Sequence, residues 1–375
     1  MASNVLSSSL LLLVSLATAV TATTHQSEEM SGGKGLPPPW AKEPSVRRLL
    51  AGTVDSGSWP PAADVVVAQG GGDDHYKKIS LALEAAPKGK SRYVILVKEG
   101  VYHETLNIMR RNVVLLGEGM GKTVITGNLS NATGTDMYLT ATVNALGHGF
   151  VAQDLTIRNT AGPEGKQALA FRSNSNKSII YRCSLEGYQD TVYAENNLQL
   201  YLGSDIYGTV DFVFGNAKAI FQSCRLLVRR PKTPGPHNVI TAQGRNSERH
   251  DSGFVFQNCT VQAAEREDLT GVETYLGRPW KTFSHVTFMD CFLDDVVTAA
   301  GWVAWKKGEE VEATKRTVSY TEFRNRGPKA DTSQRIAWEG FHVLTDAKQA
   351  EGYTVDRFIS GNLWVPLPIR YNNNI

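Results

Sequence analysis

The feature that most restricts how this 375-residue chain can fold is a short apolar pattern that occurs five times. Each copy has an apolar or aromatic pair, up to two intervening residues, a Cys or Asp, one more residue, and then an apolar residue. The copies span residues 150–157, 179–185, 220–226, 254–261 and 286–293, with the Cys or Asp at Asp154, Cys183, Cys224, Cys259 and Cys291. The steps between these positions, 29, 41, 35 and 32 residues, are irregular but of solenoid length. One strand per coil with loops of variable length predicts an all-β, single-stranded parallel β-helix, in which like side chains stack from rung to rung.

The rest of the composition agrees with a mostly β fold. Between about Val65 and Phe292, runs rich in Val, Ile and Thr alternate with Gly, Asn and Asp. Helical patterns are confined to the ends of this region, and tail segments of this kind often cap or pack along a solenoid. We expect a helix over 76–86, a strand over 340–344, and helical turns over 346–351 and 353–359.

The four cysteines allow two interpretations. An even number of cysteines in a secreted chain is compatible with disulfides, whereas free Cys is a small residue that is often buried. Because all four recur at one position of the pattern, we favour a buried ladder of free thiols. No Cys-x-x-Cys or His-x-x-x-His spacing indicates a zinc site.

Net charge limits the class of partner. Lys and Arg number 39 and Asp and Glu number 37, which gives a net charge of +2. This is too little for a nucleic-acid-binding protein by charge alone. A polyanionic substrate is compatible only if the positive charge is concentrated locally.

The N-terminal region predicts secretion. The apolar run 10–20 is too short to span a bilayer and is followed by small residues, so we expect a signal peptide over 1–22. Residues 23–61 are polar with Gly and Pro clusters and predict a flexible leader, with a processing site at the dibasic segment 47–50 (RRLL). A catalytic domain is expected over 62–370, and no later segment looks transmembrane. Sequons that support a secreted glycoprotein start at Asn128, Asn131, Asn176 and Asn258.

Two acids in strand-like sequence need a particular explanation. Asp190 and Asp211 lie among aromatic and β-branched residues, where acids are poor strand formers. Gln167 precedes Asp190 by 23 residues and Asp211 follows it by 21, and both steps are of one-coil length. Neighbouring rungs are about 4.8 Å apart, so Gln167, the Gln189–Asp190 pair and Asp211 can meet on one face.

Such a cluster has a definite chemistry. Two close carboxyl groups do not both ionise easily, so one stays protonated as a general acid while the other acts as a nucleophile or base. Two Gln amides can donate hydrogen bonds to a developing oxyanion. Arg278 near Asp211 would keep that acid ionised, and Trp280 offers a face for a sugar ring. No Gly-x-Ser-x-Gly elbow is present, which argues against a serine esterase.

At these residues the chain resembles the plant pectinesterases (pectin methylesterases). The similarity runs in order from about Ala63 to Trp364. It is carried by the segments GVYHE (100–104), QALA (167–170), GYQDT (187–191), DIYGTVDFVFGNA (205–217), ITAQGR (240–245) and LGRPWK (276–281). Shorter matches are FLDD (292–295), GW (301–302) and NRGP (325–328).

The resemblance implies a right-handed parallel β-helix, with short helices at the ends, that removes methyl esters from homogalacturonan. Asp211 matches the nucleophile and Asp190 the acid that protonates departing methanol and later activates water. Gln189 matches the transition-state stabiliser. Gln167 matches an amide that contacts the substrate, and Arg278 and Trp280 match the substrate-binding pair. It further implies a monomeric, secreted cell-wall enzyme without metal or cofactor, with protein inhibitors as possible partners.

The chain departs from the family pattern in three places. Ser204 stands where the family has a Cys bridged to the residue matching Cys224, so that disulfide is not expected. Met137–Tyr138 replaces a Thr-Phe pair that lines the family's substrate groove. The leader is too short for the inhibitor-like pro-region that many members carry, although residues 47–50 resemble the family's processing site.

Three other functions stay open at this level. A non-catalytic pectin-binding homologue would need the same fold, but the complete set of acids, amides and Arg278 argues against it. A β-helix polysaccharide lyase would need a calcium site, for which Asp294–Asp295 is the obvious acid pair. An esterase acting on another acylated or methylated polymer would use the same chemistry.

Overall fold

The computed structural model describes residues 59–72, 74–232, 237–305 and 309–375, all of which belong to one compact unit. The predicted signal peptide over 1–22, the segment 47–50 and nearly all of the predicted leader lie outside the described residues. Among the described residues, no helix combines the length and hydropathy needed to cross a bilayer.

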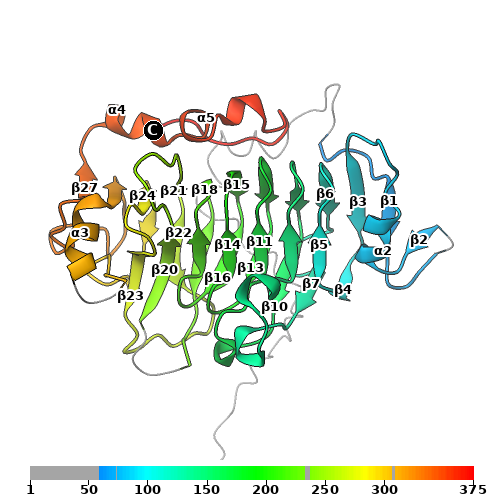
Figure 1. Cartoon of the computed structure of the whole chain (residues 1–375), viewed down its shortest axis with the longest axis horizontal. Coiled ribbons are helices and arrows are strands. Elements are labelled where there is room, and N and C mark those ends of the chain that lie inside the picture. Colours follow the sequence, from blue (N-terminus) through cyan, green and yellow to red (C-terminus); the bar gives the residue numbers. More distant parts are fainter. Residues whose placement is uncertain (1–58, 73, 233–236, 306–308) are drawn as a thin grey trace, which may run out of the picture. The chain divides into compact units, whose positions relative to one another are not determined.

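Within this part of the chain, the strands form three parallel sheets that wind around a common core (Figure 1). The twelve strands of sheet A are, in spatial order, β2 (His75–Tyr76), β1 (Val65–Val67), β3 (Tyr93–Val97), β6 (Val113–Leu116), β9 (Val151–Gln153), β12 (Ser178–Tyr181), β15 (Leu198–Leu202), β18 (Lys218–Gln222), β21 (Gly253–Gln257), β24 (His285–Met289), β26 (Ser319–Phe323) and β27 (Phe341–Leu344). The eight of sheet B are β25 (Phe292–Leu293), β22 (Thr260–Ala263), β19 (Arg225–Val228), β16 (Asp205–Gly208), β13 (Ser184–Glu186), β10 (Thr156–Asn159), β7 (Thr123–Gly127) and β4 (Gly100–His103). The seven of sheet C are β23 (Thr274–Pro279), β20 (Asn238–Gln243), β17 (Val213–Gly215), β14 (Val192–Ala194), β11 (Phe171–Ser173), β8 (Val143–Ala145) and β5 (Leu106–Ile108).

The predicted parallel β-helix is confirmed, but the prediction of one strand per coil is wrong. A complete coil contributes one strand to each sheet, for example β12, β13 and β14 in succession. The five sequence repeats mark the corner where the chain passes from sheet A to sheet B. The other corners differ in length from coil to coil, so they left no repeat in the sequence.

The corner also corrects the register of the repeat. Arg182 has a positive φ of 51° and precedes Cys183, and Asp154 occupies the same turn position with a φ of 55°. Leu155, rather than Asp154, is therefore the residue equivalent to the cysteines. The long step from Cys183 to Cys224 contains two coils, because β15 and β16 meet at a further corner around Ser204.

The prediction of a buried ladder of free thiols is confirmed. Cys183, Cys224, Cys259 and Cys291 are all free and buried. Burial raises the pKa of the Cys183 thiol to about 12, so this thiol is inert at ordinary pH. Ser204 takes the ladder position between Cys183 and Cys224, and its Oγ accepts a hydrogen bond from the Cys183 N–H at 3.1 Å.

The core is built by side chains that stack between coils. Tyr201, Phe221, Phe256 and Phe288 stand on four successive strands of sheet A, with ring centroids 4.3, 4.6 and 4.5 Å apart and nearly parallel planes. Apolar burial of aromatic side chains is a large stabilising contribution. This stack therefore fixes the rung-to-rung register that positions the other two sheets.

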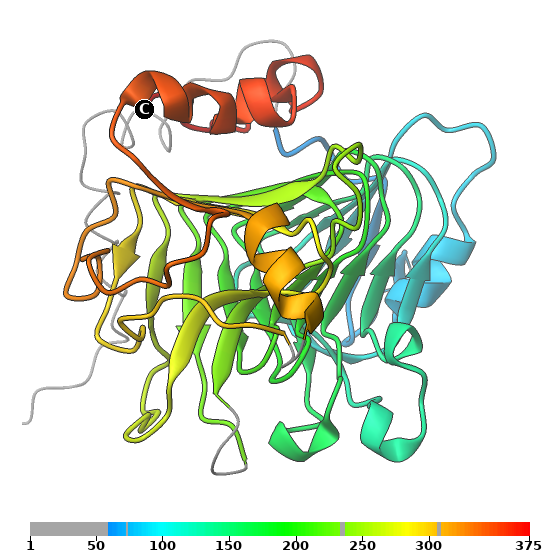
Figure 2. The same ribbon diagram turned by 60° about the vertical axis from the view of Figure 1, so that its left-hand side comes forward.

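Short helices lie mainly at the ends of the stack. α2 (Ile79–Glu84) packs at the N-terminal end, and it is shorter than predicted because His75–Tyr76 form β2. α3 (Glu309–Thr317), which the sequence did not predict, lies at the C-terminal end (Figure 2). The predicted tail elements are present as β27, α4 (Ala347–Ala350) and α5 (Val355–Phe358), and the tail follows sheet A (Figure 1). The 3₁₀ turns are η2 (Asn131–Thr133), η3 (Met137–Leu139), η4 (Pro163–Gly165), η5 (Glu351–Tyr353) and η6 (Gly361–Leu363).

Candidate active site

Two buried acids stand at the start of neighbouring strands of sheet C. Asp190 lies just before β14 and Asp211 just before β17, and the two residues are 6% and 5% exposed. Both adopt a positive φ, 63° and 52°. Asp tolerates this conformation better than most residues, but it is sparsely populated and often found at functional sites. The Asp190 N–H donates to the carbonyl of Val210 at 3.0 Å, which ties the two turns together.

Arg278 holds Asp211 with both arms of its guanidinium. Nε donates to Oδ1 at 2.8 Å and Nη2 donates to Oδ2 at 2.5 Å. The Arg278 side chain comes from β23, and the Trp305 ring centroid lies 4.2 Å from its guanidinium carbon. A bidentate contact of this kind fixes both the charge and the orientation of the carboxylate.

The electrostatics separate the two acids. Burial raises the pKa of Asp190 well above its ordinary value, and the neighbouring Asp211 charge raises it further. Burial also raises the pKa of Asp211, but the hydrogen bonds and charge of Arg278 oppose that rise. Asp211 therefore gives up its proton first, and Asp190 keeps its proton longer. At a pH between the two pKa values, the pair consists of an ionised carboxylate beside a protonated acid.

The two predicted glutamines lie in adjoining coils. The Gln189 side chain makes a hydrogen bond that lowers the pKa of Asp190 and so opposes the effect of burial. The carbonyl of Gln189 accepts from the N–H of Ala168, next to Gln167, at 3.3 Å. The carbonyl of Gln167 in turn accepts from the N–H of Asn131 in η2 at 2.9 Å. Both glutamine side chains are half-buried.

The side chains on the outer face of sheet C form a continuous row beside the acids. Strand pairing sets one outward residue on each rung, and we call this set the outer row: Asn144, Arg172, Tyr193, Phe214, Ala242 and Arg278. The neighbours of these residues within each strand point into the core, as Val192 and Ala194 do on either side of Tyr193.

The middle of the outer row is aromatic. The rings of Tyr193 and Phe214 stack at 4.4 Å with an interplanar angle of 6°. Trp280 meets both rings edge to face, at 6.5 Å from Tyr193 and 5.9 Å from Phe214. The structure thus places the predicted sugar platform, Trp280, against an aromatic cluster beside the acids.

Sequence reasoning missed several residues of this site. Trp305 packs against the aromatic cluster and no motif singled it out, whereas Met137, which packs there too, lies at the groove position expected from the resemblance. Trp280 and Trp305, together with Lys281 and Trp338, also line a cavity of about 440 Å³ next to the row. His237 lies near enough to Asp211 and Arg278 to interact with both charges, and burial lowers its pKa.

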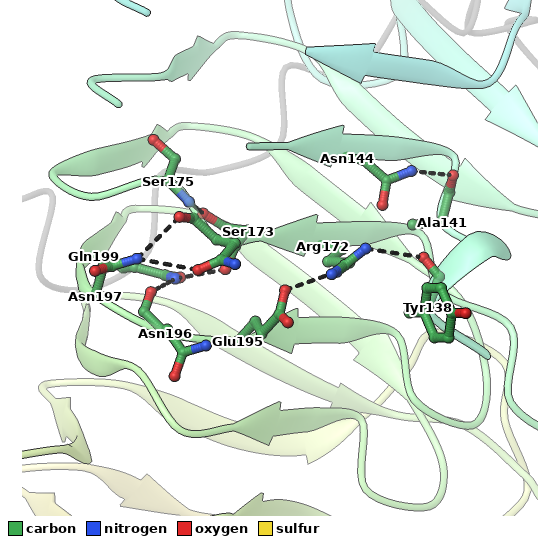
Figure 3. A network of polar contacts seen from close by, with 11 residues as sticks. Tyr138, Ala141, Asn144, Arg172, Ser173, Ser175, Glu195, Asn196, Asn197 and Gln199 are labelled. Atoms are coloured by element: carbon green, nitrogen blue, oxygen red, sulfur yellow. Dashed lines mark hydrogen bonds and ion pairs between the residues drawn. The ribbon is translucent and has the colours of Figure 1, made fainter. Parts of the chain in front are cut away.

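A polar network continues the outer row toward the N-terminus (Figure 3). The Arg172 Nε donates to the Glu195 carboxylate at 2.8 Å, and its Nη1 donates to the carbonyl of Tyr138 in η3 at 3.4 Å. The next residue of the row, Asn144, donates through Nδ2 to the carbonyl of Ala141 at 3.3 Å.

The site holds groups of the kind that acyl transfer uses. Acyl transfer uses a nucleophile, a proton donor and hydrogen-bond donors to an oxyanion, and the site holds a carboxylate in a bidentate contact, a neighbouring buried acid and two half-buried glutamines. In the described part of the chain, no group of three or more His, Cys, Asp or Glu side chains is arranged to hold a metal ion.

Comparisons with known proteins find similar sequences and similar folds. The family model described as pectinesterase matches residues 64–362. Pectinesterase 2 of Citrus sinensis is 43% identical over 332 residues, which are 88% of this chain and 62% of that relative. Among solved structures, the pectin methylesterase from carrot is 38% identical, with a TM-score of 0.80, and the match covers 86% of this chain and 100% of that one. A pectin methylesterase solved in complex with a hexasaccharide is 25% identical, with a TM-score of 0.68, 83% of this chain and 100% of that chain being covered.

Proposed function

The chain belongs to the pectinesterase family, and we propose that it is a pectin methylesterase that hydrolyses the methyl esters of galacturonate units in homogalacturonan. The products are methanol and pectate. The observation that carries the proposal is the Arg278–Asp211 pair beside the buried acid Asp190, next to the Tyr193–Phe214–Trp280 cluster. The chain spans 62% of the length of the Citrus sinensis relative.

In the first half of the reaction, the Asp211 carboxylate attacks the C6 carbonyl carbon of the ester. Arg278 aims this carboxylate and spreads its charge over two hydrogen bonds. The carbonyl oxygen becomes an oxyanion, to which Gln167 and Gln189 donate hydrogen bonds. Asp190 gives its proton to the methoxy oxygen, so methanol leaves and an acyl-enzyme anhydride joins Asp211 to C6.

In the second half of the reaction, Asp190 changes from proton donor to proton acceptor. Its carboxylate accepts a proton from water while the water oxygen attacks C6. The C6–Asp211 bond breaks, which returns Asp211 as a carboxylate and Asp190 as an acid. The substrate unit leaves as galacturonic acid, which then gives its proton to solvent and becomes galacturonate, so the atoms and charges balance over the cycle.

The aromatic cluster serves binding. Pyranose rings present apolar C–H faces, and Trp280 beside Tyr193 and Phe214 gives them a flat surface. The relative solved with a hexasaccharide supports a binding site that contacts several sugar units. Methyl-esterified pectin is accordingly the proposed partner.

The remaining expectations follow from the same proposal. A secreted enzyme of the cell wall fits the expected signal peptide over 1–22, and a catalytic domain over 62–370 fits the family match over 64–362. The monomeric state and recognition by protein inhibitors are further proposals from the family resemblance.

Methanol release tests the proposed function. The secreted protein is incubated with highly methyl-esterified pectin, and methanol and new carboxyl groups are both measured. The wild type releases equal amounts of the two, and Asp211→Ala releases neither above background. Equal methanol release by the wild type and Asp211→Ala would overturn the assignment.

A further inference from the structure

The outer row extends beyond the aromatic cluster in the N-terminal direction. Strand pairing places Arg172 next to Tyr193 and Asn144 next to Arg172. Because rungs are about 4.8 Å apart, Arg172 lies one rung beyond Tyr193 and Asn144 two. A linear polymer that lies along Phe214 and Tyr193 therefore meets Arg172 with its next units.

Glu195 neutralises the charge of Arg172. Its Nε donates to the Glu195 carboxylate at 2.8 Å, and the two side chains are only 16% and 17% exposed. An ion pair this well covered is screened less by solvent than a surface pair. The pair presents donors and acceptors to a ligand, but no net charge.

Aromatic rings flank the guanidinium of Arg172. Its central carbon lies 5.6 Å from the ring centroid of Tyr138 and 5.9 Å from that of Tyr193. The hydrogen bond from Nη1 to the Tyr138 carbonyl holds η3 next to the row (Figure 3). Tyr138 and Leu139 are 46% and 51% exposed, so this rim of the row is largely apolar and open to solvent.

The next rung is polar but also uncharged. Asn144 is 2% exposed, and its Oδ1 has no hydrogen-bond partner among the described residues. Its Nδ2 donates to the Ala141 carbonyl. Buried polar atoms normally have partners, so this oxygen is an unused acceptor beneath the row.

We propose that Tyr138, Arg172 and Glu195 form a subsite for a methyl-esterified galacturonate unit next to the reacting one, and that Glu195 determines this preference. A free carboxylate placed here loses hydration and faces the Glu195 charge, while the neighbouring Arg172 cation is already paired with Glu195. An esterified unit carries no charge and packs against the rim formed by Tyr138 and Leu139. This subsite rests on the proposed function and deepens it, because it disfavours substrate that is already de-esterified at that unit.

The test uses the isosteric substitution Glu195→Gln, which leaves Arg172 in place and uncompensated. The control is Glu186→Gln on sheet B, since Glu186 makes a similar ion pair with Arg158, at 2.6 Å, away from the outer row. Methanol release is measured on pectins of equal chain length with high and with low methyl esterification, at low salt and at moderate salt.

We expect Glu195→Gln to lower KM on the low-ester pectin roughly two- to fivefold, because a partly exposed charge contributes up to about 1 kcal/mol. KM on the high-ester pectin changes little, and the effect shrinks with salt. Glu186→Gln keeps the wild-type ratio of KM on low-ester pectin to KM on high-ester pectin. The double variant Arg172→Gln/Glu195→Gln, which again has no net charge, returns the ratio toward wild type.

An unchanged ratio in a Glu195→Gln protein that retains the wild-type circular dichroism and melting temperature would overturn the subsite. If Glu195→Gln does not fold, the double variant is tested in its place, provided that it folds. A KM ratio of low-ester to high-ester pectin that is lower than in the wild type would then contradict the proposal. Failure of the proposed function is distinguishable, because the wild type would then release no methanol from either pectin. Calorimetric binding of fully esterified and fully de-esterified hexamers to the same variants would still decide the subsite.

Discussion

Asp190 and Asp211 occupy the same position on two neighbouring coils. β14 and β17 pair with Val192 opposite Val213, and each of these valines lies two residues after one of the acids. The two acids share a positive φ and nearly complete burial. The opposite roles proposed for them therefore come from their surroundings: Arg278 reaches Asp211, and the Asp211 charge in turn raises the pKa of Asp190.

Replacing the acid should separate binding from turnover. Asp190→Asn keeps the shape of the side chain but cannot donate a carboxylic proton, so we expect kcat to fall by about 10²- to 10⁴-fold. Affinity for pectin, measured by calorimetry, stays within a few fold of wild type because the aromatic cluster is untouched. Retained turnover would remove Asp190 as the proton donor.

The geometry of the Arg278 contact should matter more than its charge. Arg278→Lys keeps the cation but loses the bidentate contact and the packing on Trp305, so we expect kcat/KM to fall about 10- to 100-fold. Arg225→Lys is the matched control, because Arg225 makes a similar bidentate contact with Asp205 on sheet B. Equal losses in the two variants would show that fold stability, not the site, explains the effect.

The pH profile follows from the two carboxyl groups. Asp190 must be protonated to release methanol, so kcat/KM falls as pH rises through its raised pKa. Asp211 must be ionised to attack, so kcat/KM falls as pH drops through its own pKa, which Arg278 holds down against burial. The profile is bell-shaped. Arg278→Gln removes the opposing cation and should move the acidic limb to higher pH; an unmoved limb would contradict the assignment of that limb to Asp211.

The ladder position of Ser204 predicts an engineered disulfide. Asp205 pairs with Arg225, so Ser204 and Cys224 adjoin on neighbouring rungs, and a spacing of about 4.8 Å lies within the range that a disulfide spans. Oxidised Ser204→Cys should bridge to Cys224 and stabilise the protein by about 3 kcal/mol, judged by thermal unfolding. A thiol titration should find two fewer free thiols than in the reduced variant. Ser204→Ala, which loses the hydrogen bond with Cys183, is the control and gains no stability; an unchanged thiol count after oxidation of Ser204→Cys would contradict the ladder geometry.

The sequence predicted the β-helix because one corner of each coil repeats a buried small residue. It did not reveal three strands per coil, since residues such as Arg182 adopt a positive φ without the glycine that would signal a turn. It also hid one coil, because Ser204 replaces a cysteine in the ladder. Only the strand pairing in the folded structure reveals the three strands per coil and the coil that contains Ser204.

The candidate site was predictable where spacing reflects the coil. Gln167, Asp190 and Asp211 are one coil apart, and the structure places them in successive coils. Trp305 lies outside the regular spacing of the coils, and only the folded chain brings its ring next to the Arg278 guanidinium. The Arg172–Glu195 pair had no sequence signal either, because Arg172 lies on β11 and Glu195 directly follows β14, and only the pairing of these strands brings the two side chains together.

The most direct test of the central claim compares two buried acids of the same kind. Asp211 and Asp205 are each held by two hydrogen bonds from an arginine, but Asp205 lies on sheet B, away from the outer row. Methanol release from highly esterified pectin is measured for Asp211→Asn and Asp205→Asn, each confirmed as folded by circular dichroism. We predict that Asp211→Asn loses methanol release to near background while Asp205→Asn keeps most of it; release by Asp211→Asn at the level of Asp205→Asn would contradict Asp211 as the nucleophile.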